Sequence, residues 1–312
     1  MRSVLLALCA LTGLAVADPK PAVNGGTVEV APAGHAITHV AIDNPLGDVH
    51  IIGYAGKTLK IEPHKQAPDD EAMDRLRVSL VANPDGSVRI STTVDGDRES
   101  RPLSRSNVRI DLIIHAPHDA TFDASVSAGK LVVEHMDSGG ELDTTSGPIS
   151  VYNVAGKLLT HSLSGVTELK TVFGSVDVQS VGADVDLDTI NGERVVASAG
   201  KGKISARKVH ARDVELTTTD GRIVLEAEAA LRGRLVVSSL RGDIDVRLRR
   251  KGAVNGAVNV RARGNHVEFG SLPVTHVDGW TTAALGHVDA HEVAASIELR
   301  SRYANVQFSI IE

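Results

Sequence analysis

The chain has 312 residues, a formal net charge of −6 at neutral pH and an aromatic content of only 3%. A mildly acidic chain without a long basic run is a poor nucleic-acid binder. The scarcity of aromatic side chains also removes the stacking platforms that single-strand binders use. We therefore expect no nucleic-acid partner.

Residues 1–17 predict a secretory signal peptide. An apolar run covers Val4–Val16, and Ala15–Ala17 offers a small-x-small cleavage site. The run is too short to span a membrane, and no later stretch is long and apolar enough to do so. A lipoprotein signal is the alternative, although Leu8 rather than a small residue precedes Cys9. Because Cys9 is the only cysteine, the expected mature chain is exported to the periplasm, cell surface or exterior without disulfides.

Residues 18–127 are expected to form an N-terminal β region that caps a stack of repeats. Such a cap is needed because an open end of paired strands invites edge-to-edge association. Residues 67–76 favour a short helix with Asp69 as N-cap. The runs that favour strands are 27–30, 37–42, 49–52, 58–62, 88–93 and 108–116.

Residues 128–271 contain a glycine repeat with a spacing near nine. Counted from Gly147, aliphatic residues stand at offsets +2, +4 and +7, and similar offsets follow later glycines. Self-similarity at a fixed period is the signature of a repeat architecture. The glycines expected at structural turns are Gly147, Gly156, Gly165, Gly174, Gly182, Gly192, Gly221, Gly233 and Gly242.

The offsets predict an all-β fold in which each unit is a short strand ending in a corner. Positions +2 and +4 share one face of a strand because side chains alternate, so Val178 should point inward and Asp177 outward. The +7 position changes parity, so the chain must turn before it. Stacked coils can bury these short strands, which predicts a β-solenoid with about two units per coil. A hairpin meander is the alternative.

Residues 272–312 are expected to be the closing strands at the other end, since residues 296–310 alternate between apolar and polar side chains. Three stretches then carry a resemblance: "IDNPLGDVHIIGYAGKTLKIE" (42–62), "VRIDLIIHAPHDA" (108–120) and the glycine repeats, followed by "ALGHVDAHEVAASIELRSRYANVQFSI" (284–310). Together they resemble the putative-adhesin domain family of secreted bacterial proteins. The resemblance implies β-helical repeats, a domain of unknown function named after adhesion, and no catalytic residues.

Asp184, Asp186 and Asp188 are the only metal candidates that the pattern singles out. They alternate with two aliphatic residues and should line one outward face of a strand, where a row of carboxylates suits calcium. A solvated strand face is the simpler interpretation. No catalytic or phosphate-binding motif occurs, so we expect no catalytic residue and no cofactor.

These observations predict an exported, non-enzymatic structural or binding module at the cell envelope, with a protein or glycan ligand that the sequence does not identify. A polysaccharide lyase or hydrolase is the alternative, because parallel β-helices host such enzymes. The scarcity of aromatic residues and the lack of an opposed pair of acids speak against it.

Overall fold

The computed structural model describes residues 23–24, 26–30, 36–96, 107–228, 233–249, 258–286 and 295–311. The expected signal peptide lies outside these residues. The described chain is all-β, as expected, with 65% strand and one short helix. None of the described residues form a helix that is long and apolar enough to cross a membrane. The strands form a mixed sheet that curls around a continuous apolar core.

The N-terminal region combines antiparallel strands with the first coil of the stack. β3 and β4 pair in parallel with β9 and β10, whereas β5 pairs with β8 and β6 with β7 in antiparallel fashion. The helix begins after Asp69, whose carboxylate accepts a hydrogen bond from the backbone N–H of Ala72. The bounds are β1 (Val23–Asn24), β2 (Val28–Val30), β3 (His39–Asn44), β4 (Val49–Tyr54), β5 (Leu59–Gln66), α1 (Asp70–Asp74), β6 (Leu76–Ala82), β7 (Ser87–Val94) and β8 (Arg109–Pro117).

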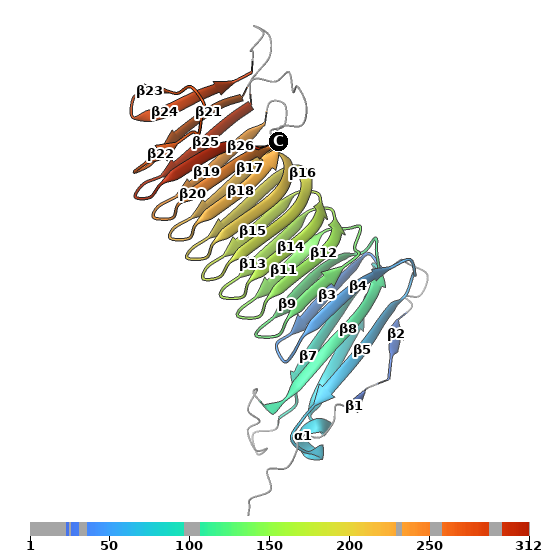
Figure 1. Ribbon diagram of the computed structural model, residues 1–312. Coiled ribbons are helices and arrows are strands. Elements are labelled where there is room, and N and C mark those ends of the chain that lie inside the picture. Colours follow the sequence, from blue (N-terminus) through green and yellow to red (C-terminus); the bar gives the residue numbers. More distant parts are fainter. Residues whose placement is uncertain are drawn as a thin grey trace, which may run out of the picture.

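The repeats form two parallel ladders that run side by side along the stack (Figure 1). One ladder contains β9, β11, β13, β15 and β19, and the other contains β10, β12, β14, β18 and β20. The long strands β16 and β17 belong to both. The bounds are β9 (Thr121–Val126), β10 (Leu131–Glu134), β11 (Gly140–Thr144), β12 (Ile149–Ala155), β13 (Leu158–Ser162), β14 (Thr167–Phe173), β15 (Val176–Ser180), β16 (Val185–Ala199), β17 (Ile204–Thr218), β18 (Ile223–Glu228), β19 (Arg234–Ser239) and β20 (Ile244–Arg249).

The pairing register follows the coil length that the glycine spacing implies. Leu131 pairs with Ile149 and Ile149 with Thr167, so partners stand 18 residues apart, or two nine-residue units. The step becomes 19 residues between Val185 and Ile204. Each coil therefore covers the apolar strand of the coil before it.

The inward and outward faces lie where the alternation places them, except at the +7 position. Val178 is fully buried and Asp177 points outward. The +7 residue Val154 is buried, but the equivalent Leu163 and Val181 are 52% and 59% exposed. The expectation that every +7 aliphatic joins the core is wrong because the two units of a coil end in different corners. Asn153, with φ of 54°, turns the chain back over the core only in the first unit.

The C-terminal strands do not follow chain order. β25 (Ala295–Ser301) and β26 (Val306–Ile311) pair directly with β19 and β20, and so continue the stack. The earlier strands β21 (Val258–Arg263) and β22 (Val267–Glu268) lie outside them. The hairpin of β23 (Thr275–Val277) and β24 (Trp280–Leu285) covers the free edge of β21 (Figure 1). The end of the stack is thus closed by 258–285, not by the last strands of the chain, because an antiparallel hairpin can cover an edge that parallel strands would leave open.

Candidate functional site

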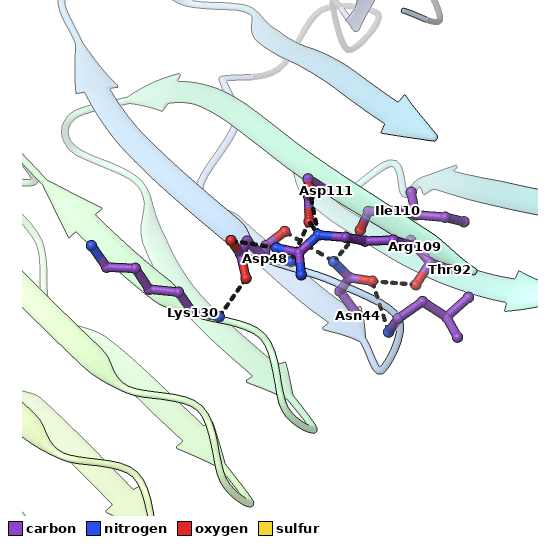
Figure 2. A network of polar contacts seen from close by, with 8 residues as sticks. Asn44, Asp48, Thr92, Arg109, Ile110, Asp111 and Lys130 are labelled. Atoms are coloured by element: carbon purple, nitrogen blue, oxygen red, sulfur yellow. Dashed lines mark hydrogen bonds and ion pairs between the residues drawn. The ribbon is translucent and has the colours of Figure 1, made fainter. Parts of the chain in front are cut away.

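The Asn-Gly-Asp motif near the start of the chain has a structural role. Asn44 is fully buried, donates hydrogen bonds to the carbonyls of Asp48 and Ile110, and accepts one from the Thr92 hydroxyl (Figure 2). Arg109 bridges Asp48 and Asp111, and the hydrogen bond to Asp111 is the main reason that the Arg109 pKa is raised. This network joins β8 to the first coil.

Asp184 belongs to a column of corner aspartates. Its carboxylate accepts a hydrogen bond of 2.7 Å from the backbone N–H of Lys203 in the next coil. Asp48 does the same for Lys130 at 2.6 Å, and Asp243 for Asn305 at 3.0 Å. The Asp184 side chain therefore holds one coil to the next at the corner.

Asp186 and Asp188 point outward but are engaged by a cation. Arg207, one coil further along, forms ion pairs of 3.3 Å with both carboxylates. The hydrogen bond from the Thr189 hydroxyl, with a smaller contribution from Arg207, lowers the pKa of Asp188 below its usual value. The three aspartates hence have separate partners, and the structure does not bring them together as a ligand set.

The ladder of β14, β16, β17, β18 and β20 carries many such pairs on its outer face. Asp245 is buried there, contrary to the expectation of a solvated side chain, because Arg222 and Arg247 cover it with ion pairs of 3.4 and 3.0 Å. Carboxylates on this face are consequently neutralised by cations from the same or a neighbouring coil, among them Glu168 by Lys170 and Glu226 by Arg249.

A different set of ligand atoms converges on the other ladder. Glu141 and Asp143 on β11 and His161 on β13 offer ligand atoms that all lie within 4.8 Å of one another. Asp143 and His161 are direct register partners, and the His161 Nε2 atom lies 3.7 Å from a Glu141 carboxylate oxygen. The sequence analysis did not find this group. The difference of 18 between positions 143 and 161 is the signal that would have found it.

Most of the nine expected turn glycines stand where backbones touch. A Cβ at Gly165 would lie 1.8 Å from the Gly147 carbonyl oxygen of the preceding coil, and Gly156 has a φ of 89°. Gly182 is different, because its nearest atom would be 3.3 Å away. Equivalent contacts under 2.5 Å occur at Gly147, Gly156, Gly174, Gly192, Gly221 and Gly242, and the carbonyl of Gly233 accepts a hydrogen bond from Ser296.

Buried hydroxyls hold the same corners, which the sequence analysis also missed. The Thr144 hydroxyl accepts a hydrogen bond from the N–H of Gly147, and the Ser239 hydroxyl accepts one from Gly242. The local pattern is a serine or threonine three residues before the corner glycine, which is a common way to satisfy turn backbone groups.

The C-terminal end holds a cavity of about 730 Å³. Val236, Asn259 and Ala284 contribute to a largely apolar lining, which comes from β19, β25, β21, β24 and the segment before β23. The lining also includes two arginines, Arg234 and Arg261. A concave, mostly apolar site of this size with a few polar groups is typical of small-molecule binding.

The charges at the cavity are unevenly compensated. Glu298 forms ion pairs with Arg261 and Arg300, and both guanidinium groups lie over the ring of Trp280, at 4.9 and 5.5 Å from its centroid. Arg234 has no ion-pair partner among the described residues, although its register neighbour on β17 is Asp213. The cavity thus presents one uncompensated positive charge.

Comparison with known proteins gives structural likeness only. No protein-family model matches the chain, and no curated protein matches it. A putative adhesin from Bacteroides fragilis has 12% identity, with 94% of this chain and 98% of that chain covered and a TM-score of 0.44. A putative lipid binding protein from Parabacteroides distasonis has 12% identity, 90% and 96% coverage and a TM-score of 0.46. A putative cell adhesion protein from Clostridium sporogenes has 13% identity, 94% and 100% coverage and a TM-score of 0.26.

Proposed function

We propose that this chain is an exported, non-enzymatic binding module of the cell envelope, built as a β-solenoid. The regular steps of 18 and 19 residues between paired strands support the solenoid. A stack of this kind is rigid along its length, since each coil contacts only its neighbours, and it suits the presentation of a ligand site at one end. Export rests on the sequence of residues 1–17 and predicts a mature protein that begins at Asp18.

The cavity at the C-terminal end is the observation that carries the proposal. Its lining is mostly apolar, and Arg234 supplies a positive charge without an internal partner. An elongated apolar ligand with an anionic group satisfies both features, because it buries apolar surface and pairs with the arginine. A glycan fits less well, since Arg261 and Arg300 already lie against the ring of Trp280.

Trp280 provides a direct test because it is the only tryptophan of the chain. Its fluorescence should change when dodecanoate or dodecyl phosphate is titrated into the mature protein, and change less with neutral dodecyl maltoside. The Arg234→Ala variant should bind the two anions about tenfold more weakly, since it loses a charge-assisted hydrogen bond. Arg212→Ala is the matched control, because Arg212 is exposed on β17 and does not line the cavity.

Two results would contradict the proposal. Equal affinity of the wild-type protein for the anionic and neutral probes would remove the role of Arg234. Turnover of an acidic or neutral polysaccharide by the mature protein, measured as reducing ends or unsaturated product, would replace the binding module with an enzyme. Intact-mass measurement of the exported protein separately tests the cleavage after Ala17.

A further inference from the structure

The outer face of β9, β11, β13 and β15 differs in charge from the face of the other ladder. These four strands contain no lysine or arginine, yet they present Asp123, Glu141, Asp143 and Asp177 outward. On the other ladder, by contrast, carboxylates are paired with arginine or lysine. The four carboxylates thus share a face on which histidines are the nearest basic groups, as in the 3.4 Å contact between His39 and Asp123.

Two observations on this face point to a cation rather than to an ordinary solvated surface. A carboxylate oxygen of Asp177 is buried and has no hydrogen-bond partner within the described chain. Asp143 is half-buried, and no ion pair with lysine or arginine forms at it among the described residues. Leaving carboxylates partly buried without compensation is costly, and a bound cation removes that cost.

The ligand types define the class of cation. Calcium and magnesium take oxygen ligands, whereas imidazole nitrogen suits zinc and its neighbours in the first transition series. Two carboxylates and one imidazole form a mixed N/O set that leaves further coordination positions for water. The donor atoms within 4.8 Å need only small side-chain rotations to reach a common ion, since the three side chains are exposed or half-buried.

We propose that Glu141, Asp143 and His161 form a binding site for a divalent transition-metal ion such as Zn²⁺. The site joins two consecutive coils, because β11 supplies the carboxylates and β13 the imidazole. Asp177, on the next strand of the same ladder, adds negative charge beside it. This site is separate from the C-terminal cavity and does not depend on the function proposed above.

Calorimetric titration of the mature protein with Zn²⁺, and with Ca²⁺ in parallel, tests the site. We expect one Zn²⁺ per chain, tighter binding of Zn²⁺ than of Ca²⁺, and a Tm that rises with Zn²⁺ because the ion binds only the folded state. Either His161→Gln or Asp143→Asn should weaken Zn²⁺ binding at least about tenfold and abolish the Tm rise. The visible absorption of bound Co²⁺ should show nitrogen and oxygen ligation in the wild-type protein and change in His161→Gln.

The matched control is His210→Gln. His210 also contacts a carboxylate, that of Glu228 at 2.8 Å, but lies on the other ladder. It should bind Zn²⁺ like the wild-type protein. The proposal is overturned if no Zn²⁺ binds, if Ca²⁺ binds as tightly as Zn²⁺, or if His161→Gln and His210→Gln behave alike. Circular dichroism of each variant separates a lost site from a lost fold.

Discussion

Buried hydroxyl groups in the coils fall into two kinds at the residue scale. Thr144 and Ser239 satisfy corner N–H groups, so their polarity contributes to the fold. Thr160 and Thr167 are fully buried, and their hydroxyl oxygens have no partner among the described residues. An unpaired buried hydroxyl costs free energy, whereas a paired one contributes to stability.

Thr167→Val is therefore expected to stabilise the protein by about 1 kcal/mol, because it replaces an unpaired hydroxyl with a methyl group of similar size. Thr144→Val should destabilise it by about 1 to 3 kcal/mol, since the N–H of Gly147 loses its acceptor. Urea unfolding of both variants measures the difference. The interpretation fails if both substitutions shift the free energy of unfolding in the same direction.

Val178→Asp tests the assignment of inside and outside at a single strand. Val178 is fully buried in the core, so an aspartate there would be an unpaired buried carboxylate and should strongly destabilise or unfold the protein. Asp177→Ala changes an outward residue and should alter the free energy of unfolding by about 0.5 kcal/mol or less. Thermal melts by circular dichroism suffice, and equal Tm values would rule out this register.

The element scale is governed by the corners between strands. The sequence could predict them because a close backbone approach restricts the residue to glycine, as at Gly165, and this restriction leaves a periodic trace. It could not predict that the two corners of a coil differ. Leu163 and Val154 follow their glycines at the same offset, yet only Val154 is buried, because the preceding left-handed Asn153 redirects the chain.

Gly165→Ala and Gly182→Ala should therefore differ in stability. The new Cβ would meet the Gly147 carbonyl at 1.8 Å in the first variant, which forces the coils apart and costs about 1 to 3 kcal/mol. In the second, the nearest atom is the Leu163 carbonyl oxygen at 3.3 Å, so the change should stay within about 0.5 kcal/mol. Chemical unfolding distinguishes the two, and equal costs would contradict the stacked corner.

Asp188 links the charge pairs of the outer face to acid stability. Its pKa in the folded state lies below the ordinary value of 3.8, mainly because of the Thr189 hydrogen bond and then Arg207. Its contribution is therefore complete above that value and is lost as the pH falls through the lower folded-state pKa. Asp188→Asn should flatten the decline of Tm on acidification in this range by a small amount, since the site is partly solvated. Identical acid slopes for the variant and the wild-type protein would count against this contribution.

At the scale of the whole molecule, the sequence predicts the coils better than it predicts their order. Alternation and glycine spacing are local features, so strands such as β12 and β14 follow from them. The placement of β25 between β19 and β21 is a long-range pairing that no local pattern encodes. The proposed metal site combines both levels, because its residues are ordinary surface groups until the 18-residue register places Asp143 beside His161.

The central claim is that residues one coil apart are neighbours, and engineered disulfides test it most directly. Residues 18–312 contain no cysteine, so a pair can be introduced without competition. Gln179 and Ser198 are exposed register partners on β15 and β16, and Thr217 lies one coil further along. Neighbouring strands are about 4.8 Å apart, which a disulfide spans, whereas two steps of roughly 10 Å exceed its reach.

Mild oxidation of the Gln179→Cys/Ser198→Cys and Gln179→Cys/Thr217→Cys double variants, followed by mass spectrometry of the peptides, gives the answer. The account predicts an intramolecular disulfide in the first variant and free thiols in the second. A disulfide in the second variant, or free thiols in both while circular dichroism shows the native fold, would contradict the stacked register on which both proposed sites depend.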